Sequence, residues 1–187
     1  MLKPAILYKA DIENLWLHAW FVDKYKYFIT SVSYDSNFMI QDNSWDSHQF
    51  ASVDADNNVL GVIMYNIHRT ANYCSSLAII SFCDEDNKSG KFIFGKDICK
   101  AIKDIFEFFK FNKIVFSAVT KNPAIKHYDR LVEKYGGRVV GVFKDDVKLV
   151  DNELYDIKYY EILRSDYLTS KLCADIKKGI ENNDKVF

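Results

Sequence analysis

Hydrophobic and polar residues follow one another along this chain with spacings that change from segment to segment. The first clear spacing is that of an amphipathic helix, in which apolar residues recur every three or four positions on one face. These residues are Ile12, Leu15, Trp16 and Ala19. Asp11 precedes them and is expected to cap the helix, because its side chain can accept a hydrogen bond from an early helical N–H.

Residues 26–46 mix aromatic and polar residues without a clear period, and we expect short helix and loop there. Three apolar runs follow, separated by polar turns, over residues 49–54, 59–68 and 73–82. Runs of this length bounded by turn residues predict an antiparallel meander of strands. The last run is apolar almost throughout, which is typical of a central strand buried on both faces.

The middle of the chain predicts a helix, a strand and a second helix. Residues 96–110 carry apolar residues at helical spacing, and residues 113–120 are rich in β-branched residues. Residues 122–137 predict a helix with Asn122 as its N-cap, Pro123 at its first position and a glycine stop. Because a helical crossover leaves the strands before and after it running the same way, we expect strands 73–82 and 113–120 to be parallel.

The C-terminal part predicts a hairpin and a last helix. Strands over 138–150 and 154–163 flank a polar turn, and Ser165 is expected to cap a helix with apolar residues from Leu168 to Ile180. No repeat, biased tract or linker divides the chain. We therefore expect a single α/β domain over residues 1–187, built on a mostly antiparallel mixed sheet with a central parallel pair and flanking helices.

Composition narrows the class of protein. The 187 residues are 49% hydrophobic, which suits one domain with a sizeable core. The formal net charge is −1, without the basic surplus that nucleic-acid binders use, so no nucleic-acid partner is expected. No apolar run is long enough to cross a bilayer, and no basic, apolar leader opens the chain, so we expect a cytoplasmic protein without a membrane partner. Four cysteines and four histidines are scattered, and no metal site is expected.

The segment after the predicted strand 113–120 carries a family likeness. Its residues are Asn122, Ala124, Ile125 and Tyr128, followed by Glu133, Lys134, Gly136 and Gly137. This order, with the hairpin that follows, resembles the GNAT superfamily of N-acetyltransferases over roughly residues 48–163. The resemblance implies a GNAT-like fold and the transfer of an acetyl group from acetyl-CoA to a primary amine. Because no nucleophile motif is visible, we expect the amine to attack directly, without an acyl-enzyme. Asn122 stands one residue closer to Ala124 than is usual in the family.

The family's cofactor loop is of the form Arg/Gln-x-x-Gly-x-Gly/Ala, and this chain departs from it. If Gly95 is the second glycine, Ile93 replaces the first; if Gly95 is the first, Asp97 replaces the second. The resemblance implies that residues 91–97 receive the pyrophosphate at a helix N-terminus, with Lys91, Gly95, Lys96 and Asp97 as cofactor contacts. The alternative is an ordinary polar connection between a strand and a helix.

The remaining site residues also come from the resemblance. It implies that Tyr128 touches the cofactor and protonates the departing thiolate, that Asn122 binds the pantetheine arm, and that the backbone from Ile80 to Phe82 pairs with that arm. The alternative for residues 122–137 is a capped amphipathic helix with a tyrosine in the core.

The base that deprotonates the amine is expected among carboxylates just after strand 73–82. Asp84 and Glu85 are the candidates, and a solvated acidic loop is the alternative. The acceptor is a small-molecule or peptide amine that the sequence does not identify further. A second functional hypothesis is a catalytically degenerate GNAT-fold module that binds or interacts without turnover.

Overall fold

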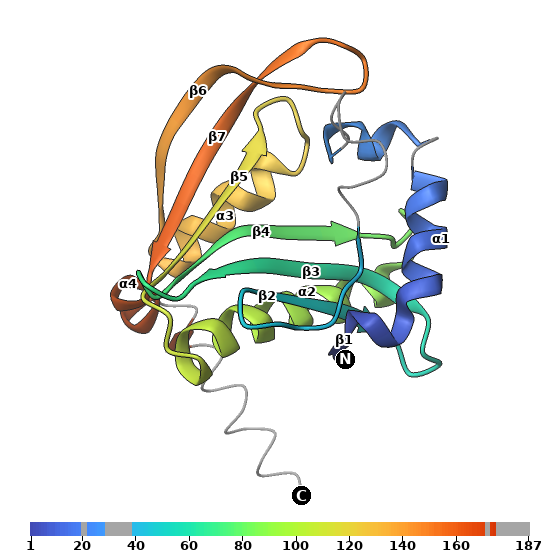
Figure 1. Ribbon diagram of the computed structural model, residues 1–187, viewed down its shortest axis with the longest axis horizontal. Helices are drawn as coiled ribbons and strands as arrows, with labels where there is room; N and C mark the ends of the chain where they lie inside the picture. The colour runs from blue at the N-terminus through green and yellow to red at the C-terminus, as the bar shows by residue number, and fades with distance from the viewer. Residues whose placement is uncertain (20–21, 29–38, 171–172, 175–187) are drawn as a thin grey trace, which may run out of the picture.

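The computed structural model describes residues 1–19, 22–28, 39–170 and 173–174 (Figure 1). Its strands form one seven-stranded sheet in the order β1-β2-β3-β4-β5-β7-β6. Their bounds are β1 Leu2–Pro4, β2 Ser47–Val53, β3 Val59–His68, β4 Tyr73–Ser81, β5 Lys113–Val119, β6 Arg138–Lys148 and β7 Leu154–Leu163. The four α-helices are α1 Lys9–Ala19, α2 Lys88–Lys103, α3 Ile125–Tyr135 and α4 Arg164–Thr169. Short 3-10 helices lie at Ala5–Tyr8 and Asp23–Phe28, and a π-helical turn follows α2 at Asp104–Phe108.

The expected mixed sheet is confirmed. β4 and β5 are parallel, and the other neighbouring strands are antiparallel, including the predicted meander and hairpin. β1 was not predicted, because three residues give no period that a pattern can reveal. It pairs with β2 through Lys3 and Ala51 and extends the sheet at that edge.

Several predicted helix starts are wrong by a few residues or more. Asp11 lies inside the first turn of α1 and does not cap it. α2 begins at Lys88, eight residues before the predicted start at 96, because the Asn87 side chain caps it by accepting a hydrogen bond from Gly90 N at 2.8 Å. Ser165 is the second residue of α4, which ends at Thr169. The rest of that predicted helix falls largely outside the described residues.

Strand alternation separates two packed layers. On β3, Val62 faces α1 and packs in a cluster with Ile12 and Trp16, whereas the next residue, Ile63, packs on the opposite face. That opposite cluster includes residues of α2 and α3 such as Ile102 and Tyr128. The sheet is therefore covered on both faces, with α1 on one side and α2 and α3 on the other (Figure 1).

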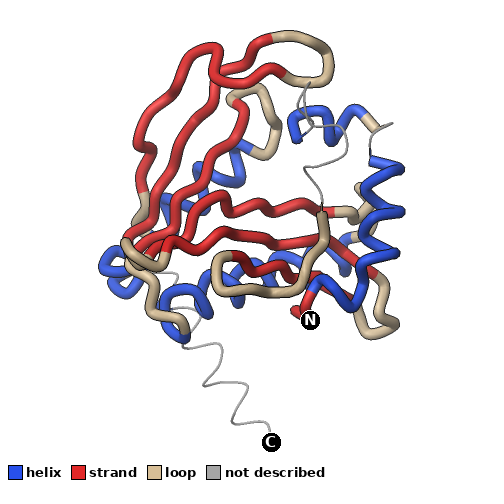
Figure 2. Tube along the Cα trace, in the orientation of Figure 1, coloured by secondary structure: helices blue, strands red, loops and turns tan. Residues whose placement is uncertain are grey.

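The two parallel strands join at one end and diverge. Among the described residues their bridge is Cys74 with Ile114, close to the start of both strands. β4 then contains one extra residue relative to β3, because Met64 pairs with Ala78 while Asn66 pairs with Ser75. Ser76 lies in this bulge with a left-handed φ of 54°. A bulge of this kind bends its strand, and Figures 1 and 2 show β4 turning away from β5. We call the side of β4 that faces β5 beyond Cys74 the splayed edge.

Ser76 provides a direct test of the strained bulge. A Ser76→Thr replacement should lower the free energy of unfolding by about 1–2 kcal/mol, because β-branched residues are disfavoured at positive φ. A Ser76→Gly replacement should stay within about 0.5 kcal/mol of wild type, because relief of the left-handed strain offsets the added freedom of the unfolded chain. Urea unfolding monitored by circular dichroism measures both values.

The matched control is Ser75→Thr, which makes the same chemical change one residue earlier on backbone without a positive φ. It should leave stability unchanged or raise it slightly, since Thr favours strands. Equal losses for the two threonine variants would contradict the strained bulge.

Candidate functional site

The splayed edge exposes the backbone of every second residue of β4. Phe82 N donates to Leu60 O at 2.9 Å, and Ile80 pairs with Val62. The backbone groups of Ile80 and Phe82 therefore face β3. In an antiparallel ladder the groups of successive residues point to opposite edges. Ile79 and Ser81 therefore present their N–H and C=O groups toward β5. Of the predicted segment from Ile80 to Phe82, Ser81 faces β5 while Ile80 and Phe82 face β3, and pairing of this segment with pantetheine stays a prediction.

Tyr25 closes one end of the splayed edge. It lies in the 3-10 helix Asp23–Phe28 and donates its hydroxyl hydrogen to Ser81 O at 2.9 Å. Its ring also contacts Trp16 and Phe82, with centroids 6.4 and 6.3 Å away. Sequence reasoning did not find this contact of Tyr25, because no local pattern connects it with a strand more than fifty residues away.

The start of α2 is an oriented group of backbone amides. Lys88 N donates to Asp86 O, Gly90 N to the Asn87 side chain, and Lys91 N to Asn87 O. Lys91 also donates through Nζ to Glu85 O at 2.6 Å. Ser89 is exposed, and its N–H has no hydrogen-bond acceptor among the described residues. The signal that could have located this start was Asn87, a favoured N-cap, three residues before Gly90.

The predicted connection over 91–97 is instead helix. Gly95 lies two turns inside α2, where its backbone is part of the helical ladder rather than a free anion site. Lys96 is exposed and places its Nζ 4.9 Å from the centre of the Phe92 ring. Asp97 is buried and accepts a hydrogen bond from Ser52 Oγ at 2.7 Å, so it faces β2. Of the four predicted cofactor contacts in this segment, only Lys91 lies in the first turn of α2.

Asn122 shapes the turn that precedes α3. It is buried, and its Oδ1 accepts a hydrogen bond from Ala124 N at 2.9 Å, which shapes the turn before α3. α3 itself begins at Ile125, so the predicted helical position of Pro123 is not realised. The amide Nδ2 of Asn122 donates to no described residue and is not fully enclosed. The hydrogen bond from Ala124 N to Oδ1 thus fixes the orientation of the amide and leaves Nδ2 as a donor.

Tyr128 lies in the first turn of α3 and is 8% exposed. Its ring contacts Phe116 of β5 and Tyr160 of β7, with centroids 5.6 and 6.3 Å away. The hydroxyl makes no hydrogen bond to a described residue, yet it is not sealed in the core. Burial raises the pKa of Tyr128 to about 12. The phenol therefore keeps its proton throughout the neutral range.

A polar cluster beside Tyr128 fixes the neighbouring side chains. Asp129 accepts hydrogen bonds from Lys158 Nζ at 2.7 Å and from Tyr160 OH at 2.8 Å through the same oxygen. Desolvation acts to raise the pKa of Asp129, but the hydrogen bonds from Lys158 and Tyr160 outweigh it and lower the pKa. These bonds tie α3 to β7 and hold the ring of Tyr160 against that of Phe116, with centroids 5.0 Å apart.

Asp84 and Glu85 follow β4 in the exposed connection to α2. The backbone carbonyl of Asp84 accepts from Asn87 N, and that of Glu85 accepts from Lys91. No described contact joins either carboxylate to Tyr128. Their role as base stays a prediction, and the structure places them at the start of α2 rather than beside α3.

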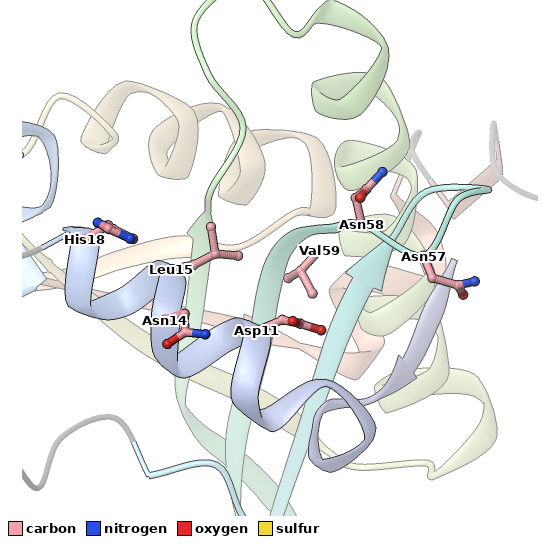
Figure 3. A pocket seen from close by; sticks show the side chains of 7 residues that line it. All are labelled: Asp11, Asn14, Leu15, His18, Asn57, Asn58 and Val59. Carbon is pink, nitrogen blue, oxygen red and sulfur yellow. The ribbon is translucent and has the colours of Figure 1, made fainter.

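A separate open pocket of about 360 Å³ lies between α1 and the turn before β3. It is lined by Asp11, Asn14, Leu15, His18, Asn57, Asn58 and Val59 (Figure 3). None of the predicted site residues lines it. Among the described residues, no helix is long and apolar enough to cross a membrane.

Comparison with known proteins gives structural matches and no sequence matches. No protein-family model and no curated protein matches the chain. A spermidine/spermine N-acetyltransferase SpeG from Vibrio cholerae, solved with manganese ions, has 22% identity and a TM-score of 0.56, over 67% of this chain and 70% of that one. A mutant form of the same enzyme has 25% identity and a TM-score of 0.55, over 69% and 72%. A chimera of the Vibrio cholerae enzyme and hSSAT has 22% identity, a TM-score of 0.55, and coverage of 66% and 71%.

These matches agree with the mixed sheet, its single parallel pair and the helices on both faces. They also agree with the resemblance carried by residues 122–137. The chain has the fold of the GNAT N-acetyltransferases.

Proposed function

We propose that this protein is an N-acetyltransferase that transfers the acetyl group of acetyl-CoA to a primary amine by direct attack. The observation that carries the proposal is the divergence of β4 and β5 after the Cys74–Ile114 bridge. Parallel strands that stayed paired would satisfy each other's backbone groups and leave no room for an extended ligand. Here the backbone groups of Ile79 and the N–H of Ser81, at the splayed edge, have no partner among the described residues.

The residues around this edge fit an acyl-CoA donor. The amide-rich pantetheine arm needs donors and acceptors in an extended arrangement, which Ile79 and Ser81 offer, and Asn122 Nδ2 supplies a further donor. The pyrophosphate needs amides and positive charge, which the first turn of α2 offers through Ser89 N–H and Lys91. Because Asn87 already caps Gly90 N, we expect its side chain to swing away when a phosphate binds there.

Tyr128 is proposed as the general acid. Acetyl-CoA supplies an activated acetyl group and a thiolate leaving group. The phenol of Tyr128 is protonated at neutral pH and has no acceptor among the described residues, so it is suited to donate a proton to that thiolate as the amine displaces it. The contacts of its ring with Phe116 and Tyr160 fix its direction, so that little reorganisation is needed during transfer.

The similar structures belong to enzymes whose names specify spermidine, so a polyamine is the first amine to test. Lysine and a peptide with a free N-terminus extend the set of acceptors. Release of free thiol from acetyl-CoA reports turnover with each. Binding of acetyl-CoA with no turnover on any of them would favour the second hypothesis, a GNAT-fold binding module.

The first prediction from the proposed function concerns the phosphate position at α2. Ser89→Asp should weaken acetyl-CoA binding at least about tenfold, because a carboxylate in the first helical turn repels a pyrophosphate there, while the free protein stays as stable as wild type or becomes more stable. Thermal shift with acetyl-CoA measures this, since a ligand at 100 times its Kd adds about 2.7 kcal/mol to the unfolding free energy.

The control for this variant is Ser165→Asp, the same change in the first turn of α4, away from the splayed edge. It should bind acetyl-CoA as wild type does. Equal binding of acetyl-CoA by the two aspartate variants would show that the phosphates do not bind at the start of α2.

The second prediction concerns the acid. Tyr128→Phe should lower kcat by about 10²–10⁴-fold and leave the affinity for acetyl-CoA within about threefold of wild type, because only the proton donor is lost. Tyr135→Phe, at the other end of the same helix, is the control and should retain full turnover. A Tyr128→Phe enzyme with unchanged kcat would exclude the phenol from the reaction.

The third prediction concerns pH. A general acid loses activity as pH rises through its pKa, and the pKa of Tyr128 is about 12. Ionisation of Tyr128 should therefore not lower the turnover number at saturating substrates between pH 7 and pH 10. Any decline in this range should also be present in the Tyr128→Phe variant. A decline centred near pH 8 or 9 that is lost in this variant would show that the phenol is ionised there and does not hold the proton as proposed.

A further inference from the structure

One short helix contacts both β4 and β5 where the two strands end. It is the 3-10 helix Asp23–Phe28, which we call the bridging helix. β4 and β5 share a bridge near their starts and then diverge, so their last residues, Ser81 and Val119, form the open end of the splayed edge. Figures 1 and 2 show the bridging helix between the end of β4 and the far end of the β6–β7 hairpin.

Tyr25 attaches the bridging helix to β4. Its hydroxyl donates to Ser81 O at 2.9 Å, and its ring contacts Phe82, the residue that follows the strand. Because the C=O of Ser81 points toward β5, the hydroxyl takes the place of a backbone N–H that β5 would supply if the strands stayed paired. The ring is buried in the cluster beneath α1, where Trp16 contacts it edge-on. Ser81 O thus has a donor without β5.

Tyr27 attaches the same helix to the end of β5 and to the hairpin beside it. Its ring contacts that of Tyr155, with centroids 6.1 Å apart, and packs against the cluster that contains Val119. Val119 is the last residue of β5, and Thr120 N donates to Asp156 O of β7 at 2.9 Å. The end of β5 and the hairpin are therefore held together, and Tyr27 contacts both.

The type of helix explains why the two tyrosines reach different strands. A 3-10 helix has three residues per turn, so side chains two positions apart point about 120° apart around its axis. Tyr25 and Tyr27 are two positions apart, and one contacts the end of β4 while the other contacts the end of β5. The six residues of the bridging helix thus carry one contact to each strand.

We propose that the bridging helix is a spacer that sets the separation of β4 and β5 at their open end, with Tyr25 and Tyr27 as positioning residues. The bulge at Ser76 bends β4 away just after the shared bridge, and the spacer fixes the separation farther along. Without one of its contacts, the strand ends are free to approach or to move apart. A ligand that needs one separation then binds more weakly, by the free energy of restoring it.

The spacer acts in the free protein, whereas its effect on acetyl-CoA rests on the proposed function. A distance measured without ligand therefore tests the spacer even in a protein that binds no acetyl-CoA. Conversely, a wild-type protein that binds no acetyl-CoA would contradict the proposed function and leave the distance result standing.

Distances between two spin labels, measured by pulsed electron paramagnetic resonance, report the separation of the strand ends. Asp86→Cys places one label beyond β4, and Val150→Cys places the other in the hairpin turn. Both positions are exposed. Cys99→Ser removes the native cysteine that is half-buried, and the other three cysteines are buried. We expect one narrow distance distribution for this labelled protein.

Tyr25→Phe in the labelled protein should broaden the distribution, because it removes the hydrogen bond to Ser81 and keeps the ring. Tyr8→Phe is the matched control, since it removes a hydroxyl that donates to Asn57 Oδ1 at 3.1 Å, in the turn between β2 and β3. It should keep the narrow distribution. An unchanged distribution in Tyr25→Phe, or equal broadening in Tyr8→Phe, would overturn the spacer.

The contact on the β5 side is tested at Tyr27. Tyr27→Ala removes the ring that contacts Tyr155 and should also broaden the distribution. Tyr27→Phe keeps that ring and should restore the narrow distribution. A narrow distribution in Tyr27→Ala would show that the bridging helix does not hold β5, and the spacer would fail.

Kinetics give a second readout that a general loss of stability does not produce. Tyr25→Phe should raise the Kd for acetyl-CoA about three- to tenfold, because binding must first restore the separation of the strand ends. Its kcat at saturating acetyl-CoA should stay within about twofold of wild type, since the bound cofactor then holds the strands itself. Tighter binding in Tyr25→Phe would contradict the spacer, because it would mean that Tyr25 competes with the cofactor for Ser81 O.

Discussion

The site depends on the interruption of pairing between two parallel strands. A parallel pair held along its length satisfies its own backbone groups and admits nothing between its members. Here pairing is limited to the bridge between Cys74 and Ile114, and the extra residue at Ser76 bends β4 away. The strain of a left-handed serine is small beside the packing that enforces it, since the sheet is covered by helices on both faces. The available amides of the splayed edge are a consequence of that bend.

The polar groups near this edge differ in how firmly they are held. Tyr128 is fixed by ring contacts to β5 and β7, and the cluster of Asp129, Lys158 and Tyr160 ties its helix to the sheet. Desolvation keeps its phenol protonated. The start of α2 is different, because Asn87 occupies part of the amide group that a phosphate would need. The acid is therefore preorganised in the free protein, whereas phosphate binding requires a side chain to move.

The two edges of the sheet also have different physical characters. β1 is too short to recruit another strand, and its neighbour β2 is paired on both sides. β6 is long, apolar at its centre and charged with opposite signs at its ends.

Sequence patterns alone determined most of the secondary structure. β3 was predicted from residue 59 to residue 68, as it is in the structure, because a turn-bounded apolar run depends on local burial. The parallel pair followed from chain order, since a crossover helix allows no other direction. The motif from Asn122 to Tyr128 indicated the fold family, because its spacing is set by one turn and one helix, and it is the source of two proposed site residues.

Only the tertiary structure decided which groups face the splayed edge. A bulge shifts strand register by one residue, so the pairing with β3, and not the local pattern, decides that Ile79 and Ser81 face β5. The start of α2 was mispredicted because the apolar run from Phe92 to Phe94 has no helical period, so the cap at Asn87 decided it. Tyr25 and β1 join the sheet through partners about fifty residues away. Such contacts depend on how the chain packs in space, and a linear pattern of apolar and polar residues records only what each segment does on its own.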